Sequence, residues 1–118
     1  MSAESALRTL LLADAGVAAL VATRITADRI AQDAVRPFVV YARSASTPVV
    51  TIDGTHLRTQ ASMEVQCWAD NRLEADALGD AVTAAVRGEI SQRVIDRGSA
   101  YDADLDMAAS IVSVQWWE

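Results

Sequence analysis

Hydrophobic and polar residues alternate between residues 61 and 67, and a helical pattern follows with almost no linker. Ala61, Met63, Val65 and Cys67 alternate with Ser62, Glu64 and Gln66, which is the period of a strand with one buried face. Trp68 ends this strand on its polar side. Asp70 or Asn71 then offers a side-chain oxygen to cap a helix that Gly88 ends. We therefore predict a strand that runs directly into a helix over residues 71–87.

Two stripes run along this predicted helix. The apolar stripe, which we expect to lie on a sheet, contains Leu73, Ala77, Leu78, Ala81, Val82 and Ala85. The second stripe consists of small residues, Ala75, Gly79 and Thr83. A glycine inside a helix costs about 1 kcal/mol relative to alanine, so we expect another segment to approach closely there. That segment is either a part of the same domain or the backbone of a neighbouring subunit, and the second interpretation makes these three residues interface candidates.

The remaining elements follow from caps, breakers and periodicity. Ser2 can cap a first helix and Asp14 a short second one. We expect a brief extended segment at 24–26, a loop over 27–36, and a strand from Pro37 to about residue 44. After Gly88 we expect a strand over 90–95, a turn over 98–104 and a long final strand over 105–117. The order predicts a single α+β domain, residues 1–118, with a mostly antiparallel sheet and helices on one face.

The final strand is apolar on both of its faces. One face carries Leu105, Met107, Ala109 and Ile111, and the other carries Val112, Val114 and Trp116. We therefore expect either a bulge or burial on both sides of this strand.

Residues 45–58 combine β-forming residues with turn residues. Val49, Val50 and Ile52 precede an Asp53-Gly54 pair that favours a tight turn. We predict a protruding hairpin arm, with His56 at its polar end. Because these apolar residues are unusual for plain surface, we expect the arm to contact another chain.

The pattern of the strands predicts that some of the tryptophan side chains face outward. Trp68 lies on the polar side of its strand, and Trp116 and Trp117 point to opposite faces of the last strand. Tryptophan is enriched where two chains meet. Either the domain's own helices or a second chain would cover these rings, so Trp68 and Trp117 are interface candidates.

Composition and charge narrow the class of protein. The chain has 118 residues, a formal net charge of −6 and a single cysteine, which suits one domain without disulfides. The negative charge argues against nucleic-acid reading and against binding to anionic membranes. All basic residues are arginines. Reactions that need a lysine, such as Schiff-base formation, are therefore excluded. Either a role of arginine in interfaces or a codon bias of the genome would explain the absence of lysine. We expect no signal peptide and no membrane span.

The residue types that carry chemistry are sparse. His56 is the only histidine and has no evident nucleophile, while Cys67 reads as a core residue. Asp102, Asp104 and Asp106 resemble the start of a calcium loop, but Met107 replaces its required glycine and Ser113 its bidentate glutamate. We predict no catalytic residues, no metal site and no cofactor.

The order of these segments resembles the tail-terminator, or tail-completion, proteins of long-tailed bacteriophages. The resemblance rests on the N-terminal Leu-Leu-Ala-Asp-Ala-Gly-Val-Ala-Ala-Leu-Val run with Arg24-Ile25 after it, on Pro37-Phe38-Val39-Val40-Tyr41, on Val65-Gln66-Cys67-Trp68-Ala69-Asp70 entering an alanine-rich helix, and on the apolar final strand. It covers nearly the whole chain. It implies a non-enzymatic virion protein that forms a homohexameric ring on the tail tube, stops tube growth and meets the head connector.

The resemblance also implies partners and a location. They are other copies of the chain, the tail tube protein and the head completion or connector protein, at the head-proximal end of the tail after assembly in the host cytoplasm. DNA would only pass through the ring. The alternatives are another head–tail joining or tube protein, and a small-molecule-binding regulatory module, because one fold hosts many functions.

Overall fold

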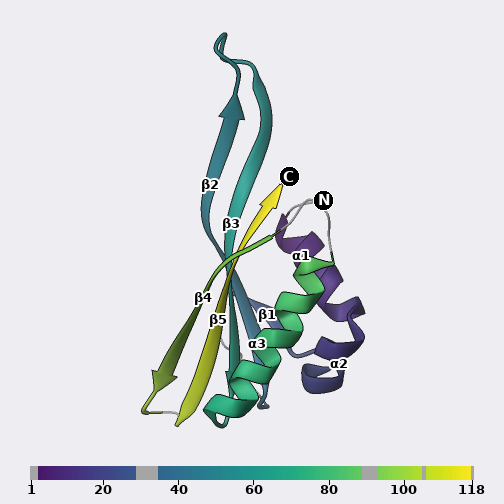
Figure 1. Ribbon diagram of the computed structural model, residues 1–118, viewed down its shortest axis with the longest axis vertical. Helices are drawn as coiled ribbons and strands as arrows, with labels where there is room; N and C mark the ends of the chain where they lie inside the picture. Colours follow the sequence, from purple (N-terminus) through teal and green to yellow (C-terminus); the bar gives the residue numbers. More distant parts are fainter. Residues whose placement is uncertain (1–2, 29–34, 89–92, 105, 118) are drawn as a thin grey trace.

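The strands form one sheet in the order β1-β2-β3-β5-β4, and all helices of the described chain lie on one of its faces (Figure 1). The computed structural model describes residues 3–28, 35–88, 93–104 and 106–117. Its helices are α1 (Ala3–Ala13), α2 (Ala15–Val21) and α3 (Arg72–Arg87), and its strands are β1 (Ile25–Ala27), β2 (Phe38–Val50), β3 (His56–Ala69), β4 (Arg93–Asp102) and β5 (Met107–Trp117). Only β1 and β2 pair in parallel. The predicted α+β class, with its mostly antiparallel sheet and its helices on one face, is confirmed.

The main core lies between the helices and the sheet. It is built from aliphatic side chains that are fully shielded, including Leu7, Leu11, Val17, Val21, Leu78, Val82 and Val86 of the helices and Val39, Met63, Val65 and Val112 of the sheet. These positions recur at helical spacing on the helices and at every second residue on the strands. The periodic apolar pattern of the sequence therefore sets which faces meet.

Side-chain caps begin α2 and α3 where the sequence predicts them, and Ser2, the predicted cap of the first helix, lies outside the described residues. The Asn71 carboxamide oxygen accepts a hydrogen bond from the Glu74 amide at 2.9 Å, at the start of α3. The Asp14 carboxylate accepts one from the Val17 amide at 3.0 Å, at the start of α2. Gly88 follows α3 and donates its own amide to the Ala84 carbonyl. Each of these bonds satisfies a backbone group that a helix end leaves unpaired.

The strand predicted at 90–95 and the turn predicted at 98–104 need correction. Residues 90–92 lie outside the described residues, but β4 runs from Arg93 to Asp102, through the expected turn. Gly98 pairs with Ile111 and Ala100 with Ala109 in the β4–β5 ladder. The glycine and serine of this segment suggested a turn, but pairing with the apolar β5 holds the backbone extended.

A second apolar cluster covers the sheet face that bears no helix. It contains Phe38, Val40, Trp68, Met107 and Ala109, none of which is more than 8% exposed. Burial on both faces of β5 is thus confirmed, and the β3–β5 register runs without a shift. The irregularity lies on β4, between Val94 and Asp96.

Candidate functional site

The β2–β3 hairpin extends well beyond the rest of the sheet (Figure 1). β3 pairs with β5 only from Gln60 onward, and β2 pairs with β1 only as far as Tyr41. Every residue from 44 to 58 is exposed. We call residues 45–58 the arm; its predicted hairpin is confirmed, although β2 continues to Val50 instead of ending near residue 44.

A hydrogen-bonded turn closes the arm at its tip. The Thr51 amide donates to the Thr55 carbonyl at 2.9 Å, and Gly54 adopts a φ of 88°, which favours glycine. The Asp53 carboxylate accepts bonds from the Thr51 hydroxyl and, at 3.1 Å, from the Thr55 amide. These bonds, the Thr51 hydroxyl first, lower the pKa of Asp53. The tip is therefore an ordered turn that carries a negative charge.

Large apolar side chains are exposed near this tip. The exposed fractions are 36% for Val49, 54% for Val50, 58% for Leu57 and 109% for Ile52. His56 lies among them and its Nε2 is 3.1 Å from the Thr59 hydroxyl. No described residue of the chain buries these groups.

The base of the arm is fixed to the domain by two arginines. Arg43 donates to the Glu4 carboxylate of α1, and to the Ser46 hydroxyl at 2.7 Å. The Arg58 guanidinium lies 5.3 Å from the ring centre of Trp117, within the range of a cation–π contact. The arm is therefore a supported extension of the sheet with an exposed tip.

The stripe of Ala75, Gly79 and Thr83 does not face outward. All three are buried within the domain, so the interpretation that a neighbouring subunit approaches them is wrong, and packing within the domain is observed. A Cβ on Gly79 would lie 2.4 Å from Ser110 Oγ and 2.9 Å from Ser110 Cβ. The missing side chain therefore lets α3 lie close to β5.

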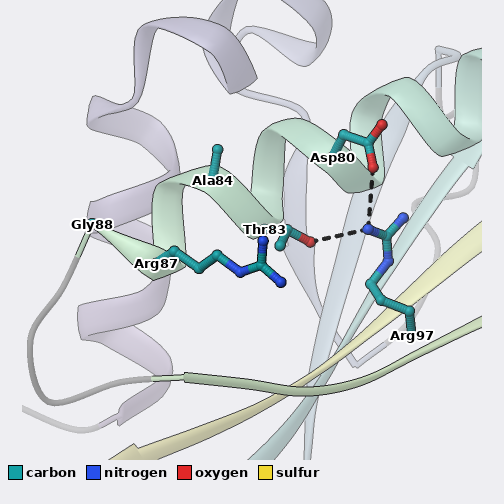
Figure 2. A pocket seen from close by; sticks show the side chains of 6 residues that line it. All are labelled: Asp80, Thr83, Ala84, Arg87, Gly88 and Arg97. Carbon is teal, nitrogen blue, oxygen red and sulfur yellow. Dashed lines mark hydrogen bonds and ion pairs between the residues drawn. The ribbon is translucent and has the colours of Figure 1, made fainter.

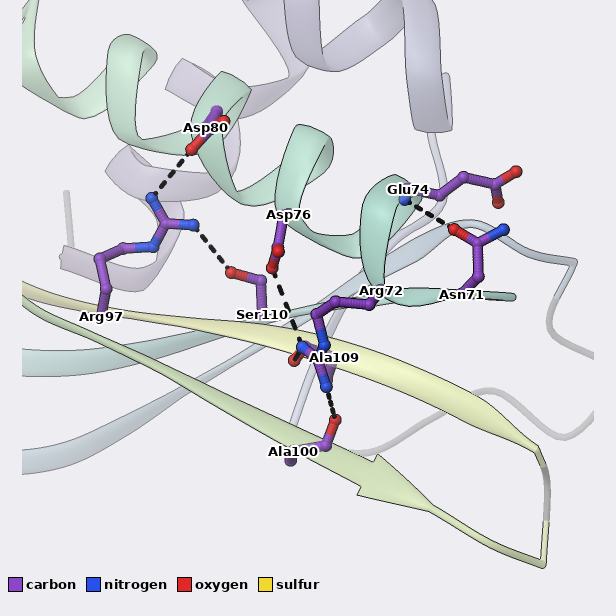
Figure 3. Close-up of polar contacts among 9 residues, drawn as sticks. All are labelled: Asn71, Arg72, Glu74, Asp76, Asp80, Arg97, Ala100, Ala109 and Ser110. Atoms are coloured by element: carbon purple, nitrogen blue, oxygen red, sulfur yellow. Dashed lines mark hydrogen bonds and ion pairs between the residues drawn. The ribbon is translucent and has the colours of Figure 1, made fainter.

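Polar bonds hold this seam between α3 and the sheet, as Figure 3 shows. Arg97 of β4 donates to the Ser110 hydroxyl at 2.9 Å, the Thr83 hydroxyl at 3.2 Å and the Asp80 carboxylate at 3.2 Å. Arg72, at the start of α3, donates to the backbone carbonyls of Ala109 at 2.6 Å and Ala100 at 2.9 Å. Both arginines therefore act as structural ties.

The same arrangement exposes part of the predicted apolar stripe. Leu73 is 84% exposed and Ala77 is also exposed, which corrects the expectation that both lie on the sheet. Close packing through Gly79 rotates α3 so that the small stripe, together with Leu78 and Val82, faces the sheet. An apolar strip of α3 therefore remains on the surface.

An apolar groove lies beside this strip, between α2 and the first half of α3. It has a volume of about 300 Å³ and is lined by Ala19, Leu20, Pro37, Glu74, Ala77 and Leu78. Sequence reasoning missed it. The sequence does contain a sign of this groove, because Leu73 and Ala77 make the apolar stripe of α3 wider than the sheet can cover.

A second hollow, of about 570 Å³, lies between the C-terminal half of α3 and β4 (Figure 2). It is lined by Asp80, Thr83, Ala84, Arg87, Gly88 and Arg97. Figure 2 shows the Arg97 guanidinium bonded to Asp80 and Thr83. Its polar atoms are therefore largely occupied by the structural ties described above.

The tryptophans differ in their environments. Trp116 lies in the main core at 5% exposure and Trp68 in the second cluster at 8%. The chain itself buries both, but only Trp116 lies in the core under the helices, as one interpretation expected, whereas strand residues surround Trp68 on the face without helices. Trp117 is half-buried beside Arg58 and remains the accessible ring of the set.

The remaining chemistry-bearing residues have local roles. Burial raises the pKa of the Cys67 thiol to about 12, far from a reactive thiolate. The Asp102 carboxylate accepts from the Asp104 amide at 3.0 Å, and the Asp106 carboxylate accepts from the Tyr101 hydroxyl at 2.6 Å. In the described part of the chain, no group of three potential metal ligands comes together. None of the described helices is both long and apolar enough to cross a membrane.

One family model matches nearly the whole chain, and a solved structure shares its fold. Residues 5–118 match the family model described as tail completion protein gp17. A chain in the solved structure of the virion of a native gene transfer agent particle has a TM-score of 0.79 and 17% identity, and the match covers 97% of this chain and 92% of that one. No curated protein matches.

Proposed function

The chain belongs to the tail completion protein gp17 family, a family of phage tail structural proteins, and on that premise we propose that it is a tail terminator. In this role it forms a homohexameric ring at the head-proximal end of the tail tube. The ring stops elongation of the tube and joins it to the head completion or connector protein. The protein works through surfaces and catalyses no reaction.

The observation that carries this proposal is the exposed arm on a chain matched to the family over nearly its whole length. Ile52, Val50 and Leu57 are costly to leave in water, because burial of one such side chain is worth about 1.5–3 kcal/mol. A patch of this kind marks a contact with another protein. The arm residues Val49, Val50, Ile52 and His56, and Trp117 at its base, are the interface residues that we retain from the sequence.

The charge of the chain suits a passage for DNA. A net charge of −6 leaves no excess of cations to bind phosphates. A ring of such subunits would let the genome pass through its opening without holding it.

Two other functions compete with this one. Another joining or tube protein of the same particle would use the same arm, so it differs only in its position. A small-molecule-binding module would need a receptive pocket. The larger hollow is walled by Arg97, which is already bonded to the protein, and the apolar groove between α2 and α3 offers one charged group, Glu74, to fix a ligand. The tail terminator therefore ranks first.

Electron microscopy of particles assembled without the protein tests the proposal. We expect overlong tails, or tails without heads, because nothing stops the tube or receives the head. Complementation with the unaltered chain is the control and restores the normal length. Normal, headed tails in its absence would contradict the proposal. Ligand-dependent thermal stabilisation would instead support the regulatory module.

A further inference from the structure

We infer that the tip of the arm docks into the groove between α2 and α3 of a second copy of the same chain. The inference rests on the proposed function, since it names the contact that joins neighbours in the ring. It assigns the receiving surface, which the family match does not identify. The Ile52 side chain and its neighbours of one copy would bind in the groove around Ala77 of the next copy.

The two surfaces match in chemistry and in size. The tip exposes apolar side chains beside the charged Asp53, with Ile52 fully exposed and Val50 and Leu57 more than half exposed. The groove is lined mainly by Ala19, Leu20, Pro37, Ala77 and Leu78, and its Leu20 is 39% exposed. Its volume of about 300 Å³ exceeds the roughly 150 Å³ that holds a benzene ring, so it has room for a branched apolar side chain.

A polar contact supports the same pairing. Glu74 is the one acid among the groove residues, and its carboxylate has no ion pair or hydrogen bond among the described residues. Figure 3 shows this carboxylate pointing away from α3. On the arm, His56 follows the turn and offers a hydrogen-bonding ring to this carboxylate, whereas Arg58 lies at the base beside Trp117 and the Asp53 carboxylate is bonded within its own turn to Thr51 and Thr55.

The placement of the two surfaces excludes an internal contact and favours a ring. The arm extends at one end of the long axis, whereas α2 and the start of α3 lie toward the other end (Figure 1). The molecule is 51 Å long in this direction, so the arm cannot reach its own groove. A contact between unlike patches at opposite ends is head-to-tail, and such contacts close into rings when the rotation between subunits allows.

Cysteine cross-linking in assembled particles tests this contact. The double variant Ile52→Cys/Ala77→Cys places one thiol at each end of the proposed contact, and Ile52→Cys/Leu20→Cys probes a second position in the groove. The native Cys67 is buried with a pKa of about 12 and will not compete. After oxidation, we expect a ladder of linked chains on a non-reducing gel, because each copy is linked to the next.

The matched control is Ile52→Cys/Ala84→Cys. Ala84 is an exposed alanine of the same helix, seven residues further on and therefore about 10 Å away. Disulfides need Cα atoms within about 7 Å, so this variant should give no ladder. Single Ile52→Cys and Ala77→Cys variants should give none either, because a head-to-tail contact never places like positions together.

Particles that contain the double variants but show no ladder would overturn the inference. So would a ladder from the Ala84 variant, or linkage of the thiol introduced at position 52 to a different tail protein, because the arm would then have another partner. A different result would contradict the proposed function itself: particles assembled without the protein would then have normal tails. In a competent particle, replacing Ile52 or Ala77 with aspartate should weaken incorporation about 10- to 100-fold, which is the effect of losing one buried side chain.

Discussion

The arm and the seam between α3 and β5 are both built from small and β-branched residues, but their environments are opposite. In the seam, Ala75, Thr83 and Ser110 are at most 5% exposed. In the arm, the larger Val50 and Ile52 are exposed, and no described residue from 44 to 58 is covered. Residue size and polarity alone therefore do not determine burial; the presence of a facing element does.

The difference follows from where the strands end. β5 pairs with β3 as far as Trp117, which lies opposite Gln60, and among the described residues neither a third strand nor a helix covers the hairpin beyond that point. The seam has both. Changes in the seam should therefore act on folding, whereas changes at the arm tip should act on assembly.

The largest effect on folding is expected for Gly79→Val. The new Cβ would lie 2.9 Å from Ser110 Cβ, which is closer than two carbon atoms can pack. α3 would therefore have to move away from β5. We expect the free energy of unfolding to fall by about 2–3 kcal/mol, measured by urea denaturation. Thr47→Val, a β-branched residue on the exposed arm, is the control and should change it by less than about 0.5 kcal/mol. Equal values for the two variants would remove the contrast between seam and arm.

A smaller loss is expected for Arg97→Met. This change removes the donor to the Ser110 hydroxyl, which is 1% exposed and would be left unpaired. We expect a loss of about 1–2 kcal/mol in the same assay. The double variant Arg97→Met/Ser110→Ala should recover part of it, because no buried hydroxyl remains without a partner. Arg87 lines the same hollow, and Arg87→Met should leave the free energy of unfolding nearly unchanged. An equal loss of stability in that variant would mean that the loss of a positive charge, and not of the bond to Ser110, is the cause.

The pH dependence of stability should contain a contribution from Cys67. Burial raises the pKa of this thiol from 9.0 to about 12. Between these values the unfolded chain loses the proton and the folded chain keeps it, so stability falls as the pH rises above 9. Relative to Cys67→Ala, the unaltered chain should lose about 1.4 kcal/mol between pH 7 and pH 10. Parallel pH curves would mean that the thiol is accessible to solvent.

The smallest effect on folding is expected for Ile52→Asp at the arm tip. Its side chain has no neighbours to lose, so the free energy of unfolding should change by less than about 0.5 kcal/mol. Incorporation into particles should nevertheless fall about 10- to 100-fold, as counted by electron microscopy. Thr47→Asp, lower on the arm, carries the same charge and should be better tolerated. A destabilised Ile52→Asp monomer would show that the tip packs within its own chain.

The sequence is sufficient to predict the elements whose signals are local. Caps at Asp14 and Asn71 depend on side chains within three residues of the groups they bind, and the Asp53-Gly54 turn depends on local backbone preference. Those predictions are confirmed. The extent of β4 could not be predicted, because Gly98 is held extended by a partner strand that lies further along the chain.

The candidate site was only half predictable for a related reason. The arm is visible in the sequence because apolar residues border a turn. The groove depends on the rotation of α3 about its axis, which is fixed by the close approach of Gly79 to Ser110. Two stripes on one helix compete to face the sheet, and the packing between distant residues decides which one does. Leu73 and Ala77 are therefore exposed although their spacing predicts burial.

The outer edge of the arm also affects how the free protein behaves before assembly. From Ser44 to Ile52 the strand has no charged residue, and an uncharged edge invites aggregation with other chains. Three features interrupt it. Register shifts lie between Arg43 and Ala45 and between Val49 and Val50, and the proline at position 48 has no amide hydrogen to donate. These interruptions oppose the pairing of this edge with a strand of another chain. A Pro48→Thr chain should therefore precipitate at a lower concentration than the unaltered one.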